Sequence, residues 1–111
     1  MKTLGIDIGS SSVKVSLLDI GTGACVASST NPAQEMRIDA PQSGWAEQDP
    51  EMWWHYATEG IRKIAAEHPM NDVRAIGITY QMHGLVCVDK SGRPLRKAII
   101  WCDSRTVEIG A

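Results

Sequence analysis

The feature that most constrains this chain is a short glycine- and serine-rich segment between two β-rich runs near the N-terminus. Residues 3–8 and 13–18 are dominated by apolar and β-branched side chains, and Gly9 and three serines separate them. Two such runs joined by small residues predict a β-hairpin. A third β-rich run at residues 24–29 follows a glycine-containing turn, so we expect the three strands to form an antiparallel meander.

The middle of the chain predicts a long helix. Asp49, Pro50 and Glu51 are typical of a helix start, because Asp caps free N–H groups and Pro is tolerated in the first turn. Pro69 predicts that the helix ends near His68. Largely apolar residues recur at spacings of three and four and so form a stripe along one face of this helix. They are Trp53, Ala57, Ile61, Ile64 and His68. We expect this stripe to pack on a sheet.

Further strands are expected on both sides of the helix. A short one is predicted at residues 34–38, and three follow the helix at residues 73–80, 85–89 and 98–101. The expected order is β-β-β-(β)-α-β-β-β, which is an α/β fold. Residues 106–109 are typical of the first turn of another helix, so we expect the chain to be the N-terminal part of a longer domain.

Composition excludes several classes of protein. The chain has 111 residues, of which 43% are hydrophobic, and its formal net charge is −2, so it predicts one ordinary domain and no nucleic-acid partner. Asp7 interrupts any N-terminal leader, and no apolar run is long enough for a membrane span, so we expect a cytoplasmic protein without a membrane partner. Cys25, Cys87 and Cys102 are odd in number and widely spaced, which favours buried thiols.

The serine-containing segment has the chemistry of a phosphate site. Glycine allows an anion to approach the backbone, N–H and hydroxyl groups donate hydrogen bonds, and a lysine adds positive charge. The residues that would face a phosphate are Gly9, Ser10, Ser11, Ser12 and Lys14. Asp7 would hold Mg²⁺ beside the phosphates. The segment matches neither a Walker A loop nor a dinucleotide-binding fingerprint, and spacing alone fits a tight hairpin with a capping Asp equally well.

A second group of side chains lies at or just after the ends of two of the expected strands. It consists of Gln81, Met82, His83, Trp101 and Asp103. Hydrogen-bonding groups beside an apolar or aromatic wall are typical of a sugar site. Taken singly, however, the histidine also fits a loop residue, the tryptophan a core aromatic and the last aspartate a turn former or helix cap.

Together with residues 44–50 and the pair Trp53-Trp54, these segments resemble the FGGY family of carbohydrate kinases, most closely its xylulose kinases. The serine-containing hairpin resembles the first phosphate motif of the wider actin, sugar-kinase and heat-shock-protein ATPase superfamily. The resemblance implies a ribonuclease H-like (actin-like ATPase) fold, ATP and Mg²⁺ as cofactors, and phosphoryl transfer to a ketose, D-xylulose first. Another pentulose or hexulose, an ATPase activator and an interaction domain of the same superfamily stay open as alternatives.

The resemblance also implies roles for single residues. Asp7 would assist the magnesium-bound phosphates, and residues 9–12 with Lys14 would face them. Met82 and His83 would contact the ketose, while Asp103 would bind its hydroxyls with Trp101 beside them.

The resemblance covers only the N-terminal part of the family's first domain, assigned here to residues 1–111. The family's general base and adenosine pocket come later in the chain, so we expect these residues alone to be inactive. Apolar surface meant for the missing part is expected to cause dimerisation or larger self-association.

Overall fold

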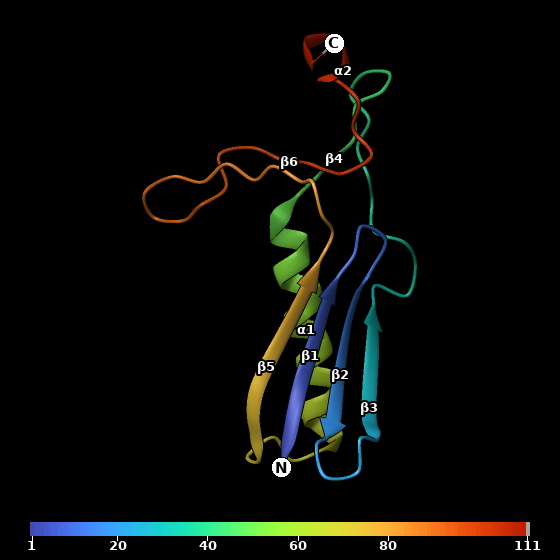
Figure 1. Ribbon diagram of the computed structural model, residues 1–111, viewed down its shortest axis with the longest axis vertical. Coiled ribbons are helices and arrows are strands. Elements are labelled where there is room, and N and C mark those ends of the chain that lie inside the picture. The colour runs from blue at the N-terminus through green and yellow to red at the C-terminus, as the bar shows by residue number, and fades with distance from the viewer. Residues whose placement is uncertain (111) are drawn as a thin grey trace.

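The computed structural model describes residues 1–110, which form a four-stranded sheet, a long helix and a smaller two-stranded sheet (Figure 1). In chain order the elements are β1 (Lys2–Ile8), β2 (Val13–Asp19), β3 (Cys25–Asn31), β4 (Glu47–Gln48), α1 (Pro50–Glu67), β5 (Val73–Tyr80), β6 (Ala98–Ile99) and α2 (Val107–Gly110). The predicted meander, the helix, the strand after it and the helical turn near the end are confirmed.

The larger sheet has the strand order β3-β2-β1-β5. β2 pairs antiparallel with both β1 and β3, whereas β5 pairs parallel with β1. Asp7 therefore lies opposite Lys14 on one side and Thr79 on the other. β1 and β5 finish at the same end of the sheet. The turn between β1 and β2 lies at that end too (Figure 1).

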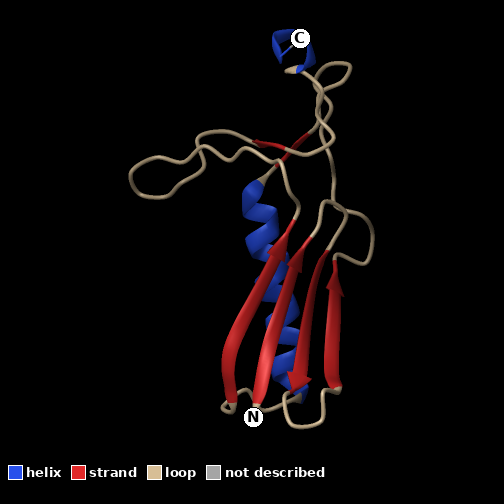
Figure 2. Ribbon diagram, viewed as in Figure 1, coloured by secondary structure: helices blue, strands red, loops and turns tan. Residues whose placement is uncertain are grey.

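α1 covers one face of this sheet (Figure 2). Asp49 caps it, because its carboxylate accepts a hydrogen bond from the N–H of Glu51 at 3.0 Å. The predicted stripe faces the sheet: Ala57 and Ile64 are buried and the other members are half-buried. Across residues 1–110, neither helix combines the length and apolar character needed to cross a membrane.

Alternate residues of β1 and β2 point into this helix–sheet layer, as the period of a strand requires. Leu4, Val15 and Leu17 are buried against Ile64. α1 lies close to β2 at Gly60, where a Cβ atom would lie 2.7 Å from Cγ2 of Val15. The helix can therefore pack this close to β2 only because residue 60 lacks a side chain.

Two predicted strands are absent or reduced. Residues 34–38 were expected to form a strand, but they have no partner strand among residues 1–110. Met36 in this segment is buried, and its N–H donates to the carbonyl of Ser11 at 2.8 Å. Residues 85–89 form only isolated bridges, from Leu85 and Val88. Both stretches lack a neighbouring strand long enough to make a ladder.

The last predicted strand, at residues 98–101, is shortened to β6 and pairs with β4. β4 was not predicted, because two residues carry no periodic signal. These two short strands bring the segment before α1 against the segment near the end of the chain.

The prediction of buried cysteines is wrong. Cys25 and Cys102 are exposed and Cys87 is half-buried. Cys25 begins the edge strand β3, on the sheet face that α1 does not cover, and Cys102 lies in a turn after β6. An apolar side chain without a layer above it stays in contact with solvent.

We expect Gly60→Ala to lower the free energy of unfolding by about 1 kcal/mol in urea denaturation, because overpacking costs about 1–3 kcal/mol and the gain in helix propensity is only about 1 kcal/mol. Ala65→Gly, at an exposed position of α1, is the matched control and should cost about 1 kcal/mol through propensity alone. A Gly60→Ala variant more stable than the parent would show that the helix–sheet contact has room for a methyl group.

Candidate functional site

The turn between β1 and β2, residues 9–12, is called the serine turn below. It is closed by a hydrogen bond from the N–H of Gly9 to the carbonyl of Ser12 at 2.9 Å. A Cβ atom at Gly9 would lie 3.1 Å from that carbonyl oxygen, so the turn favours glycine there. Within residues 1–110 the N–H groups of Ser10, Ser11 and Ser12 make no hydrogen bond. Adjacent free donors of this kind suit an anion.

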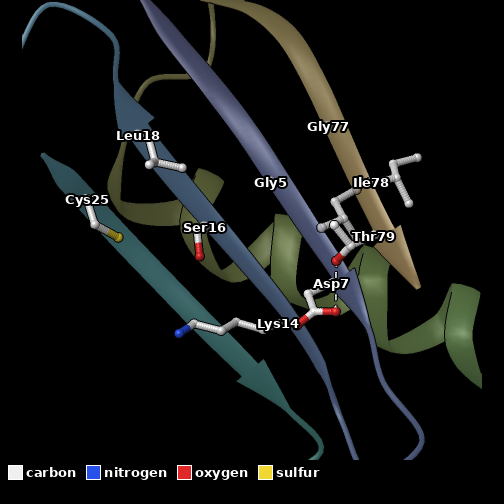
Figure 3. A pocket seen from close by; sticks show the side chains of 10 residues that line it. Gly5, Asp7, Lys14, Ser16, Leu18, Cys25, Gly77, Ile78 and Thr79 are labelled. Carbon is white, nitrogen blue, oxygen red and sulfur yellow. Dashed lines mark hydrogen bonds between the residues drawn. The ribbon is translucent and has the colours of Figure 1, made fainter. Parts of the chain in front are cut away.

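Asp7 lies beside this turn, on the face of the sheet that α1 leaves open (Figure 3). Its carboxylate accepts a hydrogen bond from the hydroxyl of Thr79 at 2.9 Å. Both residues line a shallow hollow of about 560 Å³ on this face. Lys14, opposite Asp7 on β2, points away from it in Figure 3, and the two form no ion pair. The carboxylate therefore keeps an oxygen available for a cation.

The residues present fit Mg²⁺ bound mainly by phosphate. Among residues 1–110 there is no group of three or more His, Cys, Asp or Glu side chains that could hold a metal. Magnesium is commonly held by one or two carboxylates together with substrate phosphates and water, so one exposed carboxylate beside a turn of free donors is sufficient. Asp7 is the group that would contact it.

A small pocket of about 320 Å³, called the strand-end pocket below, lies where β5 and β6 end. It is lined by Gln81, Met82, His83 and Trp101, so four of the five side chains of the second predicted group come together. Trp101 is 57% exposed, which rules out the interpretation of a core aromatic. His83 has φ 61°, a left-handed backbone conformation that is uncommon outside glycine and marks a sharply turned loop.

The strand-end pocket touches the serine turn. The indole N–H of Trp101 donates to the hydroxyl of Ser10 at 3.3 Å. A larger, mostly apolar cavity of about 390 Å³ adjoins the pocket and shares Gln81 and His83 with it. The serine turn and the strand-end pocket are therefore in contact at the same end of the sheet.

Asp103 does not line the strand-end pocket. Its side chain is 3% exposed and accepts hydrogen bonds from the N–H of Ala46 at 2.7 Å and from the backbone and guanidinium of Arg105. Hydrogen bonds from the Arg105 guanidinium hold the pKa of Asp103 well below its usual range, although desolvation opposes this. The same pairing raises the pKa of Arg105. This geometry matches a turn former.

Arg105 connects the loops above the sheet. Its guanidinium bonds Glu47 at 2.7 Å and stacks 3.7 Å from the ring centroid of Trp45. Arg96 bonds the same Glu47 oxygen at 2.5 Å. Sequence reasoning missed this network, because the partners are 49 and 58 residues apart and no local pattern pairs them.

Sequence reasoning also gave no role to Gln48, which is completely buried beneath the serine turn. Its position in the segment 44–50, which carries part of the family resemblance, was the only available signal. A buried amide cannot be distinguished from a surface one by residue type.

Comparisons with known proteins identify the family of the chain. Residues 2–111 match the model of the FGGY family of carbohydrate kinases, N-terminal domain. The xylulose kinase of Escherichia coli K12 is 40% identical over 105 residues, which are 95% of this chain and 21% of that protein. The chain therefore spans about a fifth of the length of the relatives it matches.

Solved structures agree. A xyloylose kinase from Brucella ovis superposes with a TM-score of 0.88 at 34% identity, and a gluconate kinase from Lactobacillus acidophilus with 0.85 at 27%. Each covers 97% of this chain, and the chain covers 22% and 21% of them. The expected actin-like ATPase fold is confirmed for this part of the domain.

The ion pair of Asp103 predicts a pH dependence of stability. Because the folded state lowers the pKa of Asp103, its stabilisation is complete above the unfolded pKa of about 3.9 and is lost as pH falls below that value. We expect Asp103→Asn to lower the free energy of unfolding at neutral pH, and the difference from the parent to shrink at about pH 2–3 in urea titrations. Glu35→Gln, the same kind of change at an exposed position, is the control. An Asp103→Asn deficit that is the same at both pH values would contradict the ion-pair argument.

Proposed function

Because the chain belongs to the FGGY family of carbohydrate kinases, we propose that it supplies the phosphate-binding turn and part of the sugar site of an enzyme that phosphorylates a ketose with ATP. The observation that carries the proposal is the contact between Trp101 and Ser10. It makes the surface suited to phosphate and the surface suited to a sugar continuous, as phosphoryl transfer requires. D-xylulose is the proposed acceptor, and the names of two relatives that are 40% identical to this chain, both xylulose kinases, support it.

On the phosphate side, the free N–H groups and the hydroxyls of residues 10–12 would donate to phosphate oxygens, and Gly9 would let the anion approach the backbone. Lys14 would add a point charge rather than a directional contact. Asp7, held in place by Thr79, would contact the magnesium ion that accompanies ATP. When bound, that ion supplies neutralisation of the charge that develops on the phosphates.

On the sugar side, Met82 and Trp101 would supply the apolar wall, and Gln81 and His83 the hydrogen bonds. Asp103 would contribute little to sugar binding directly, because it lies outside the pocket and its carboxylate oxygens already accept from Arg105 and Ala46. Its larger contribution would be to hold the turn that follows Trp101.

The reaction also needs a group that accepts the hydroxyl proton, and we assign this role to none of these residues. Asp7 serves the phosphate side, and Asp103 is held as an anion by Arg105. We therefore expect the 111-residue chain alone not to phosphorylate xylulose. ADP release by the chain that depends on both xylulose and Asp7 would overturn this expectation.

In the intact protein, we expect Asp7→Asn to lower kcat for D-xylulose phosphorylation about 100-fold or more while the ketose dissociation constant changes little, because the variant loses a charge that acts on the phosphates. A coupled ADP assay and calorimetry measure the two quantities. Asp72→Asn, at the other end of the sheet, is the matched control and should retain activity. The same assay with other pentuloses, hexuloses and glycerol tests the acceptor, and a ketose used better than D-xylulose would replace it.

We also propose that the 111-residue chain self-associates through β5. This strand lies at the edge of the sheet with an unpaired side, and Ile76, Ile78 and Tyr80 are exposed on it. Such an edge is a template for another strand.

Light scattering at micromolar concentration should therefore find dimers or larger species of the chain. Ile78→Lys should shift them toward monomers, because a charge on the edge disfavours pairing. Val88→Lys, at a similarly exposed position outside the four-stranded sheet, should leave the size of the species unchanged. A monodisperse monomer of the parent chain would contradict the proposal.

A further inference from the structure

Gln48 is completely buried, with 0% of its surface exposed, between the serine turn and the strand-end pocket. It belongs to β4 and lies opposite Ala98 of β6. The proposed function gives this side chain no task. A buried amide is costly unless its hydrogen bonds are satisfied, so its partners indicate what it does.

The amide of Gln48 uses its full hydrogen-bonding capacity. Nε2 donates to the carbonyl of Ser10 at 2.6 Å and, more weakly, to that of Arg37 at 3.5 Å. Oε1 accepts from the indole N–H of Trp53 at 2.8 Å and from Nε2 of Gln81 at 3.4 Å. An amide has two donor hydrogens and two acceptor positions, and these four contacts occupy them.

These partners also fix which way the amide points. The indole of Trp53 can only donate, and the carbonyl of Ser10 can only accept. Turning the amide over would set donor against donor and acceptor against acceptor in a buried position, which is costly. Gln48 therefore holds the serine turn at one defined distance from the start of α1.

A ring of contacts connects the two halves of the site through this residue. On one side, Gln48 bonds Ser10, which in turn bonds Trp101. On the other side, Gln48 bonds the side chain of Gln81, and both Trp101 and Gln81 line the strand-end pocket. The backbone N–H of Gln81 also donates to the carbonyl of Ile8 at 2.9 Å, just before the serine turn. A shift of the turn cannot occur without disturbing the wall of the pocket.

We propose that Gln48 is a positioning residue that couples the serine turn to the strand-end pocket, so that a ligand bound at one site raises the affinity of the other. The inference rests on the proposed function, because it takes a nucleotide phosphate as one ligand and a ketose as the other. A ligand that moves the serine turn also moves the wall of the strand-end pocket through these shared hydrogen bonds, so the binding free energies at the two sites are linked.

The test is calorimetry on the intact protein. The dissociation constant of D-xylulose is measured alone and with saturating magnesium and the β,γ-imido analogue of ATP, and the ratio is the coupling factor. We expect a factor of about 5 or more in the parent, within the usual range for coupled sites. Gln48→Met, which keeps the shape and removes the hydrogen bonds, should bring it toward 1. Gln42→Met, the same change at an exposed position, should leave it at the parent value.

Trp101→Phe provides a second test that leaves the core intact, because this side chain is exposed. It removes the bond to Ser10 but keeps an aromatic ring, and it should also lower the coupling factor. If circular dichroism shows that Gln48→Met is unfolded, the coupling factor of Trp101→Phe alone tests the proposal. A parent factor of 1, or variants that keep the parent factor, would overturn the coupling and leave the kinase proposal standing. A parent that binds neither ligand would overturn both.

Discussion

The candidate site depends on the parallel pairing of β1 with β5. The carboxyl ends of parallel strands reach the same edge of a sheet, so this pairing brings Asp7 beside Thr79 and the serine turn beside Gln81. An antiparallel arrangement would carry the segment that follows β5 to the opposite end, away from the phosphate surface. α1 makes the parallel pairing possible because it returns the chain to the starting edge while covering one face of the sheet. One crossover thus decides both where the core lies and where chemistry can occur.

Local signals in the sequence were sufficient to predict the elements that have a clear hydrophobic period or a helix-capping residue. Asp49-Pro50 marked the start of α1, and residues 73–80 of the predicted strand coincide with β5. The serine turn could be located because glycine and serine interrupt two β-rich runs. Gln81, Met82, His83 and Trp101 were predicted to lie close together because each lies at or just after the end of a strand, and they line one pocket in the structure.

What could not be predicted depends on contacts between distant segments. The strands expected at 34–38 and 85–89 had suitable side chains but no partner, and pairing is not a property of one run. The exposure of Cys25 follows from the open face of the sheet, which composition does not reveal. Glu47 and Gln48 are residue types that usually lie at the surface. In this fold both are buried, and the carboxylate of Glu47 accepts hydrogen bonds from two arginines.

The pairing of β1 on its two sides also orders events during synthesis. β2 follows β1 after four residues, whereas β5 begins only at Val73, after the whole helix. As the chain leaves the ribosome, β1 can complete its hairpin early, while its second edge stays open until residue 80 has emerged. The serine turn can therefore form before the strand-end pocket, whose residues 81–83 and 101 emerge later. The two surfaces have different folding histories although they share one wall.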